Sequence, residues 1–364
     1  MTITHIEAIP VSVPLRYPFK AAYGVRDSAD FVVVKVHADN GMVGLGEAAT
    51  IPIYDDGSQG GVVYCIERHL APLLIGEDPR RIGALHERMD AALKGARYAK
   101  SAIDYALYDI TARFHNLPVY QLLGGYNRPV EVTAVFGADD TSELLVQAEA
   151  KKREGYRVFK LKIGSNHKRD VERVRLLREV IGEEAELRLD GNESWRGIEA
   201  RCRINDFRPS RPAHIEQPLP RWDVSGLGAL RRTVSVPVAV DEAAVSPHDV
   251  HRVVSYAAGD LLNVKTARSG GLFPSLKVAA VAEAAGIPPF VGSMLELGVG
   301  TVANGHFAAA LTGGVRATEL VGPQFVKRDI LKVDLVYENG YLRLPEGPGW
   351  GVELDEAALR EFRC

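Results

Sequence analysis

Two lysines lie close together near the middle of the chain, at the end of a short apolar run. Lys160 and Lys162 are separated by one residue, so a β-strand would point both side chains to the same side. Two ammonium groups held together repel each other, which predicts a lowered pKa for at least one of them. A lysine with a lowered pKa can serve as a base near neutral pH. The alternative is a solvated edge strand whose lysines face water.

Three carboxylates follow the next three apolar runs. Asp190, Glu216 and Asp241 lie roughly 25 residues apart, which is the length of one βα repeat. Acids that converge in this way repel one another unless a cation lies among them. Oxygen ligands with room left for water and substrate favour Mg²⁺, or Mn²⁺. Any one of these acids alone would be read as a helix N-cap, but the three at this spacing predict a metal site.

Lys265 ends the following run, and three further polar residues accompany the set. In a closed barrel the second and sixth strands lie opposite each other, so we expect Lys265 to face Lys162 across a pocket. A buried lysine without a partner is costly, and a salt bridge to one of the acids is therefore the alternative. Asn192 and Asn263 are expected to support the charged groups. Glu296 is expected to orient a lysine or bind substrate, unless it caps a helix.

The elements that must position these residues alternate regularly between residues 129 and 325. Short apolar runs are separated by helical segments such as 168–181, 272–285 and 299–311. The runs are VEVTAVFG, RVFKLKIG, ELRLD, AHIEQP, VPVAVDE, LLNVK, PPFVGS and RATELVG. Eight such runs predict a (β/α)8-type barrel, with the active site at the carboxyl ends of its strands. A doubly wound open sheet is the alternative, and it is disfavoured because no glycine-rich phosphate loop follows the first run.

Residues 1–128 and 326–364 have a different pattern and predict an α+β capping domain. Strand alternation over residues 1–14 is followed by an expected loop over residues 15–30, a hairpin with an Asp-Asn-Gly turn, and helices near 60–75, 79–94 and 99–115. Strand alternation returns in the tail, around an Asn-Gly turn. We therefore expect the tail to pack back on the capping domain.

Composition limits the possible partners. The chain has 364 residues, a formal net charge of −3, 46% hydrophobic residues and 25% charged residues, as in soluble globular proteins. No basic stripe indicates a nucleic-acid partner, and no apolar run is long enough to span a membrane. Three scattered cysteines and the lack of a signal-peptide pattern predict a cytoplasmic protein.

Six motifs resemble those of one known family. They resemble, in the same order, motifs of the enolase superfamily and specifically of its muconate lactonizing enzyme subgroup. The six motifs are KLK, LDGNESW, HIEQP, AVDE, NVKTARSGG and GSMLELG. The resemblance extends over nearly the whole chain and includes YAKSAIDYALYDI near the N-terminal end. It implies a barrel with a capping domain, Mg²⁺ as cofactor, a small carboxylic acid as substrate, and a homo-oligomer.

The resemblance also implies roles for individual residues. It assigns the three metal ligands to Asp190, Glu216 and Asp241, the two opposite acid/base groups to Lys162 and Lys265, and the neighbouring cation to Lys160. Two loops of the capping domain, residues 21–27 and 49–56, are expected to shape the pocket. Tyr23 and Tyr54 are the candidate substrate contacts in these loops, with ordinary surface packing as an equal alternative.

The chemistry implied is the removal of a proton next to a carboxylate, which gives an enediolate stabilised by metal. The segment 317–323 resembles the cycloisomerases and lacks the Asp-x-Asp with which the dipeptide epimerases hold a substrate ammonium group. We therefore expect a cycloisomerase of muconate or a similar unsaturated dicarboxylate. The alternative is a racemase, epimerase or dehydratase of an amino-acid-like acid, because two lysines permit two-base chemistry. A non-catalytic barrel that binds a small acid is the remote alternative.

Overall fold

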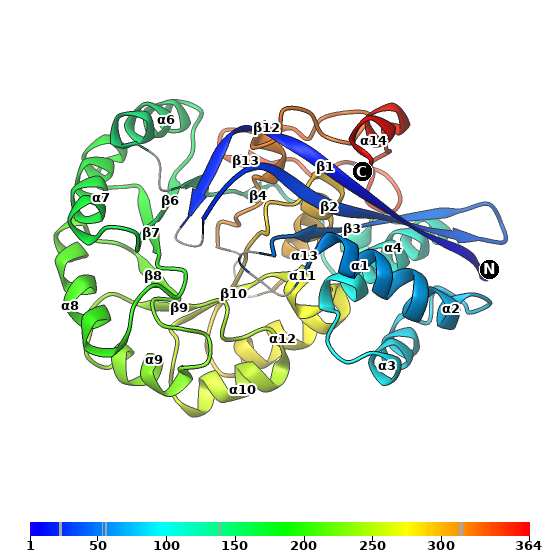
Figure 1. Ribbon diagram of the computed structural model, residues 1–364, viewed down its shortest axis with the longest axis horizontal. Coiled ribbons are helices and arrows are strands. Elements are labelled where there is room, and N and C mark those ends of the chain that lie inside the picture. The colour runs from blue at the N-terminus through cyan, green and yellow to red at the C-terminus, as the bar shows by residue number, and fades with distance from the viewer. Residues whose placement is uncertain (22–23, 53, 55–56, 138–139, 313–315) are drawn as a thin grey trace.

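The N-terminal part of the chain forms an antiparallel sheet with helices packed against it (Figure 1). The computed structural model describes residues 1–21, 24–52, 54, 57–137, 140–312 and 316–364. Its first sheet has the strand order β1-β2-β3, with bounds Ile3–Ala21, Gly24–Ala38 and Val43–Thr50. The turn between β2 and β3 contains Gly41 at a φ of +82°, as the Asp-Asn-Gly sequence predicts.

The first hairpin is longer than we expected. Instead of a loop over residues 15–30, β1 and β2 stay paired almost to their ends, where Ala21 lies opposite Gly24. The expectation was wrong because turn-forming residues indicate a loop only when no partner strand satisfies their backbone groups. The register of the pair shifts after Pro14, and Pro18, which cannot donate a ladder hydrogen bond, lies in the shifted stretch.

Helices follow the sheet, and the long helix α4 packs closely on it. Their bounds are α1 Gln59–Cys65, the π-helical turn η1 Ile66–Leu70, α2 Ala71–Leu74, α3 Ile82–Ala92, α4 Arg97–Phe114 and α5 Val119–Leu122. These positions confirm the predicted helical stretches. Helix α4 lies so near β3 that a Cβ atom at Gly46 would overlap the carbonyl oxygen of Ala102. This glycine therefore allows the helix and the sheet to approach closely.

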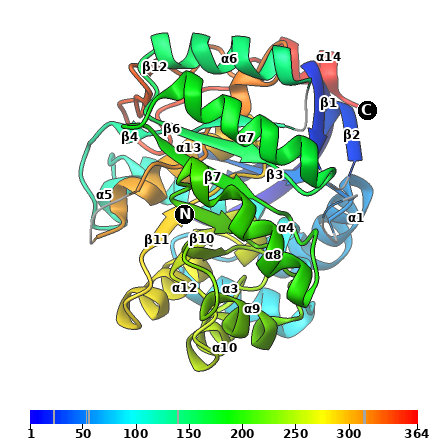
Figure 2. The same cartoon turned by 90° about the vertical axis from the view of Figure 1, so that its left-hand side faces the viewer.

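The next part of the chain alternates strands and helices, with helices such as α7 and α8 outside the strands (Figure 2). Its parallel sheet has the order β11-β10-β9-β8-β7-β6-β5. The strands are β5 Ala134–Phe136, β6 Val158–Lys162, β7 Glu186–Asp190, β8 His214–Glu216, β9 Val238–Val240, β10 Leu261–Val264 and β11 Pro289–Val291. The helices are α6 Thr141–Arg153, α7 His167–Ile181, α8 Gly197–Phe207, α9 Val224–Arg231, α10 Pro247–Ser255, α11 Thr266–Ser269, α12 Leu272–Ala284 and α13 Gly298–Ala310, with 3₁₀ turns η2 Arg208–Ser210 and η3 Gly322–Gln324. None of the helices in the described residues is long and apolar enough to cross a membrane.

The eighth predicted run closes the barrel without forming a regular strand. On one side, the Thr318 N–H donates to the Glu131 carbonyl at 2.8 Å, and the Thr133 N–H donates to the Thr318 carbonyl at 2.8 Å. On the other side, the Glu319 N–H donates to the Val291 carbonyl at 3.0 Å. The segment thus joins β11 to the chain just before β5. The predicted barrel with an α+β capping domain is confirmed, and the open-sheet alternative is excluded because both sheet edges are paired.

The tail contacts both parts of the molecule. Its hairpin, β12 Tyr337–Glu338 and β13 Tyr341–Leu342, pairs with β4 Val130–Glu131 beside the barrel. Its last helix, α14 Glu356–Phe362, lies near β1, and the Trp350 indole N–H donates to the carbonyl of Leu45 in β3. The domain boundaries at residues 128 and 325 stay a prediction.

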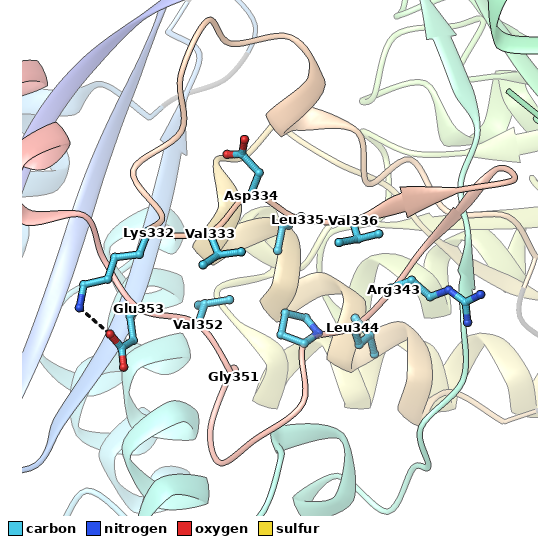
Figure 3. Close-up of a pocket in the computed structure, with 11 residues that line it drawn as sticks. Lys332, Val333, Asp334, Leu335, Val336, Arg343, Leu344, Gly351, Val352 and Glu353 are labelled. Carbon is cyan, nitrogen blue, oxygen red and sulfur yellow. Dashed lines mark hydrogen bonds and ion pairs between the residues drawn. The ribbon is translucent and has the colours of Figure 1, made fainter.

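A pocket in this tail is shown in Figure 3. It is lined by Lys332, Val333, Asp334, Leu335, Val336, Arg343, Leu344, Pro345, Gly351, Val352 and Glu353. Lys332 and Glu353 form an ion pair of 2.6 Å at its edge. None of the residues to which the sequence assigns chemistry lines this pocket, so it is not the candidate active site.

Candidate active site

The predicted chemical residues gather at the carboxyl ends of neighbouring barrel strands. In the parallel ladders Lys162 lies opposite Asp190, and Asp190 lies opposite Glu216. Asp241 and Lys265 follow directly after β9 and β10. Parallel strands bring their carboxyl ends to the same edge of a barrel, which converts the regular sequence spacing into proximity. All five side chains are buried, with no more than 8% of any residue exposed.

Lys160 lies at the centre of a carboxylate cluster. Its Nζ donates to both carboxylate oxygens of Glu216 at 2.9 and 2.8 Å and to Oε1 of Glu319 at 2.6 Å. The same Nζ lies 2.9 Å from Oδ2 of Asp190, to which Lys162 donates at 2.6 Å. Both lysines therefore point to the same side of β6, as the strand period predicts. The alternative of a solvated edge strand is wrong because Lys160 is fully buried.

Asp241 forms a second ion-paired group. Its Oδ2 accepts a hydrogen bond from Lys265 Nζ at 2.7 Å, and its Oδ1 accepts one from Arg268 Nη1 at 2.8 Å. The salt bridge considered as the alternative for Lys265 is thus present. Lys265 nevertheless lines the same pocket as Lys162. Because β6 and β10 are separated by three strands of the curved sheet, the two lysines approach this pocket from different walls.

The lowered lysine pKa expected from the Lys-x-Lys pair is not found at Lys160. Burial alone would lower this pKa, but the charges of Asp190, Glu216 and Glu319 outweigh burial and raise it well above its ordinary value. The pKa of Lys265 is also raised, because the charges of Asp241, Glu216 and Glu242 together outweigh the effect of burial. The expectation was wrong for Lys160 because it considered only the repulsion between the two lysines and left out the neighbouring carboxylates.

The adjacent acids Asp241 and Glu242 differ in their electrostatic surroundings. Burial would raise the pKa of Asp241, but Lys265 and Arg268 outweigh burial and lower it to about 2. For Glu242, burial and the charge of Asp241 raise the pKa to about 7. Neighbouring groups whose surroundings separate their pKa values are typical of sites that handle protons.

The two predicted supporting amides contact the acids. Asn263 Nδ2 donates to Oε1 of Glu216 at 3.0 Å, and Asn192 Nδ2 donates to Oε1 of Glu242 at 3.1 Å. The amide oxygens of both asparagines and Oε2 of Glu242 are buried without a hydrogen-bond partner among the described residues. Buried oxygens of this kind require a donor or a cation.

Tyr54 lies in the site, whereas Tyr23 lies outside the described residues. The Tyr54 hydroxyl donates to Oε1 of Glu242 at 2.5 Å and is 3.4 Å from both Oδ2 of Asp241 and Nζ of Lys265. Burial and the charges of Asp241 and Glu242 raise the pKa of Tyr54 well above its ordinary value, so its hydroxyl keeps its proton. The structure thus brings this capping-domain residue to the charged groups.

Glu296 acts as a loop cap in the structure and makes no hydrogen bond to a lysine among the described contacts. Its Oε2 accepts hydrogen bonds from the Ser293 hydroxyl at 2.5 Å and the Met294 N–H at 3.0 Å. Asn304 Nδ2 donates to Oε1 at 3.3 Å. Among the described contacts, these bonds hold the loop before helix α13 and reach neither a lysine nor a backbone N–H group of the helix, so both roles expected of Glu296 stay predictions.

Three charged residues of the site were not singled out from the sequence. Glu319 contacts Lys160, Arg268 contacts Asp241, and Glu242 contacts Tyr54. Glu319 lies within the eighth run, RATELVG, rather than after its last apolar residue, so the strand-end signal that found the other acids did not single it out. The contacts of Arg268 and Glu242 depend on segments far apart in the sequence and carried no local signal.

The pocket above these groups is small, with a volume of about 30 Å³. Its charged lining consists of Lys162, Lys265 and Glu319, and its remaining lining consists of Ile51, Tyr54, Val135, Ser293, Met294 and Leu295. Ile51 and Tyr54 belong to the capping domain, so the pocket is bounded by both parts of the chain. A mainly apolar pocket with a few convergent polar groups is typical of a small-molecule site.

The acids suit a hard cation by their chemistry. Among the described residues, no three His, Cys, Asp or Glu side chains are spaced to hold a metal ion, because lysines lie between the acids. The donor set around Asp190, Glu216 and Asp241 is nevertheless all oxygen, and partnerless buried oxygens of Asn192 and Asn263 adjoin it. Oxygen donors of this kind fit Mg²⁺.

Comparison with known proteins gives the family. Residues 3–124 match the model of the mandelate racemase / muconate lactonizing enzyme N-terminal domain, and residues 143–358 match the enolase C-terminal domain-like model. The chain belongs to the enolase superfamily, in its muconate lactonizing enzyme subgroup. The members of this subgroup that it matches are cycloisomerases, racemases and epimerases, and the chain is an enzyme of this superfamily.

Members with different reactions are about equally similar to the chain. Muconate cycloisomerase 1-2 of Acinetobacter lwoffii is 36% identical, over 99% of this chain and 95% of its own length. The N-succinyl-L-Arg/Lys racemase of Bacillus cereus is 33% identical, over 100% of this chain and 98% of its own length. The crystal structure of the muconate lactonizing enzyme from Pseudomonas fluorescens, complexed with muconolactone, matches with a TM-score of 0.96 and 33% identity, over 100% and 99%. Subgroup membership alone therefore does not select the substrate.

Proposed function

We propose that this enzyme transfers a proton at the carbon next to a carboxylate, with Lys162 and Lys265 as the groups that hold the proton and Mg²⁺ as cofactor. The observation that carries the proposal is that both lysines line one pocket at the strand ends, beside Asp190 and Asp241. A proton next to a carboxylate is weakly acidic, because its removal places a second negative charge on a small group. Bound Mg²⁺ would supply the electrostatic stabilisation of that charge.

The proposed ligands of the cation are Asp190, Glu216 and Asp241. Among the described residues, this cluster holds five carboxyl groups and four cationic groups, so that it has an excess of negative charge when all of them are ionised, namely Asp190, Glu216, Asp241, Glu242 and Glu319 against Lys160, Lys162, Lys265 and Arg268. A substrate carboxylate would add to this excess of negative charge. An added divalent cation would balance it, which is the electrostatic reason for a metal at this position.

For the overall reaction we propose cycloisomerisation of muconate or a similar unsaturated dicarboxylate. In such a step, an oxygen of one carboxylate forms a bond to an alkene carbon, and the electron pair moves toward the other carboxylate. The carbon next to that carboxylate then takes a proton from a lysine ammonium group, and the reverse reaction returns this proton to the amine. The segment 317–323, which carries Glu319 and no Asp-x-Asp, and the similarity to the Acinetobacter lwoffii cycloisomerase support this choice.

Ultraviolet absorbance tests this reaction. Incubation with cis,cis-muconate and Mg²⁺ is expected to remove the absorbance of the conjugated diene, and Lys162→Ala and Lys265→Ala are expected to prevent the loss. Omission of Mg²⁺ in the presence of a chelator serves as the control. An unchanged absorbance at high enzyme concentration would exclude muconate as substrate.

A racemase of an N-acyl amino acid is the second candidate, favoured by the two lysines on different walls of the pocket. One lysine could remove the α-proton from one face while the other returns a proton to the opposite face. Incubation of N-succinyl-L-arginine in D₂O tests this reaction. Exchange of the α-proton together with loss of optical rotation would favour the racemase. The absence of exchange, of turnover and of any effect of Mg²⁺ across a panel of acids would favour a barrel that only binds.

A further inference from the structure

Helix α13 follows the pocket wall directly, yet its own N-terminal residues do not cap it. The residue at its N-cap position is Leu297, whose side chain offers no hydrogen-bond acceptor. The first N–H groups of a helix have no partner within the helix and must find one elsewhere. The loop just before it contributes Ser293, Met294 and Leu295 to the pocket lining. The way in which this helix end is held therefore bears on the shape of the pocket.

The missing acceptors come from a different part of the chain. Glu47, in β3 of the capping sheet, accepts hydrogen bonds from the Leu297 N–H at 2.7 Å through Oε1 and from the Gly300 N–H at 2.8 Å through Oε2. Asp329, in the tail, accepts one from the Gly298 N–H at 2.9 Å. Glu47 is fully buried. Both of its carboxylate oxygens thus serve one turn of a barrel helix.

The loop that Glu47 anchors holds a strained backbone. Leu295 has a φ of +59°, in the left-handed region that a branched side chain rarely adopts. Such a conformation persists only where surrounding contacts hold it. At the start of the loop, the Gly292 N–H donates to the Val264 carbonyl at 3.0 Å, and at its end the Leu297 N–H donates to Glu47. The strained residue lies between these two anchors.

We propose that Glu47 is a positioning residue of the active site, which holds residues 292–297 in the conformation that makes Met294 and Leu295 the pocket wall. The capping sheet thereby acts on the pocket wall through the N-terminus of a barrel helix. The kinetic part of this proposal rests on the proposed function, whereas its structural part does not.

Hydrogen exchange of Glu47→Gln, read at single amides, tests the structural part. A glutamine keeps the size of the side chain but presents one acceptor and one donor, so one of the two N–H groups loses its partner. Exchange at Leu297 and Gly300 is expected to be about tenfold faster than in the unchanged protein, and exchange at Met294 and Leu295 is expected to rise with it. Faster exchange at the helix amides with unchanged exchange at the two wall amides would reduce Glu47 to a helix cap and overturn the proposal.

Two further variants keep this test interpretable. Asp104 is also buried in the capping domain, where it accepts a hydrogen bond from the Leu272 N–H of barrel helix α12 at 2.6 Å and lies 2.7 Å from Nε2 of His86. Asp104→Asn is therefore the matched control, expected to weaken the fold without changing exchange at the wall. If Glu47→Gln fails to fold, Glu47→Asp retains the carboxyl group but is too short to reach both N–H groups, and the same exchange pattern is expected from it.

Kinetics with a substrate that the enzyme turns over test the remaining part. Since the lysines and acids are untouched in Glu47→Gln, KM is expected to rise about tenfold while kcat stays within about twofold. A fall in kcat at unchanged KM would contradict a role in shaping the wall. If the unchanged protein turns over none of the candidate acids, the proposed function fails, and the exchange pattern still decides whether Glu47 holds the wall.

Discussion

The two acids beside the pocket lysines, Asp190 and Asp241, each have two cationic partners. Asp190 lies within 2.9 Å of both Lys160 and Lys162, and Asp241 lies within 2.8 Å of both Lys265 and Arg268. Removing one member of an isolated buried ion pair is strongly destabilising because it leaves an uncompensated charge. Here the second partner remains, so substitution of a single lysine can separate loss of chemistry from loss of folding.

Replacing Lys162 with alanine is expected to lower turnover by about 10²–10⁴-fold, the usual contribution of a general acid or base. Circular dichroism and thermal unfolding should remain close to those of the unchanged protein, because Asp190 keeps Lys160 as its partner. Lys168→Ala, which changes an exposed lysine in the next helix, is the control. Near-normal activity of the Lys162 variant would remove this residue from the mechanism.

The proposed metal ligands are open to a direct binding measurement. Asp190→Asn and Glu216→Gln each remove the charge of a proposed Mg²⁺ ligand and are expected to weaken Mg²⁺ binding at least tenfold in calorimetry. Asp206→Asn, at an exposed acid on helix α8, should leave the affinity unchanged. Equal Mg²⁺ affinity in all three variants and the unchanged protein would place the cation elsewhere.

At the scale of elements, the close packing of helix α4 on the capping sheet depends on two glycines of β3. A Cβ atom at Gly46 would overlap the carbonyl oxygen of Ala102, and one at Gly44 would overlap that of Ala106. The obstructing atoms belong to the backbone of α4, which cannot rotate away as a side chain can. The helix and the sheet must therefore separate if either glycine gains a side chain. Since β3 also carries Glu47, such a movement would reach the pocket wall.

Gly46→Ala is accordingly expected to lower the free energy of unfolding by about 1–3 kcal/mol, as overpacking in a core does. Urea denaturation measures this change. Gly60, an exposed residue of helix α1 with no atom near its would-be Cβ, provides the matched control. Gly60→Ala is expected to be neutral or to stabilise the protein by about 0.5–1 kcal/mol. Equal stability of the two variants would show that the contact between α4 and β3 adapts easily.

At the scale of the whole molecule, His306 joins three parts of the chain. It belongs to barrel helix α13, its Nδ1 accepts a hydrogen bond from the Tyr120 N–H at 3.0 Å, and its ring lies 5.4 Å from that of Trp350 in the tail. Burial lowers the pKa of His306 to about 3. The histidine is therefore neutral in the folded protein at any pH at which the protein is expected to work.

This pKa predicts a loss of stability in acid. Below the ordinary pKa of 6.5, the unfolded chain binds a proton that the folded chain does not bind until about pH 3. The contribution of neutral His306 to the free energy of unfolding is therefore complete above pH 6.5. Below that pH the free energy of unfolding falls by about 1.4 kcal/mol per pH unit for this one proton. His306→Gln is expected to reduce this slope by about one proton in urea denaturation between pH 7 and pH 5. His248→Gln, at an exposed histidine, is the control, and equal slopes in both variants would contradict the assignment.

The spacing of Lys162, Asp190, Glu216, Asp241 and Lys265 was enough to predict the barrel and the meeting of these side chains. The reason is physical, because each residue ends a strand and parallel strands share one edge. The Asn-Gly and Asp-Asn-Gly turns were likewise predictable, since they depend on neighbouring residues alone. Local sequence patterns thus determined the architecture and the candidate site.

Only the tertiary structure decided which charges pair. The raised pKa of Lys160 comes from Asp190, Glu216 and Glu319, which lie 30, 56 and 159 residues away in sequence, and no local pattern indicates that one lysine contacts all three. The same holds for Glu47, whose carboxyl oxygen accepts a hydrogen bond from the N–H of Leu297, 250 residues further along the chain at the start of helix α13. Hydrogen bonds and ion pairs depend on distances of a few ångströms between separate elements, and those distances exist only after the barrel, the capping sheet and the tail have packed together.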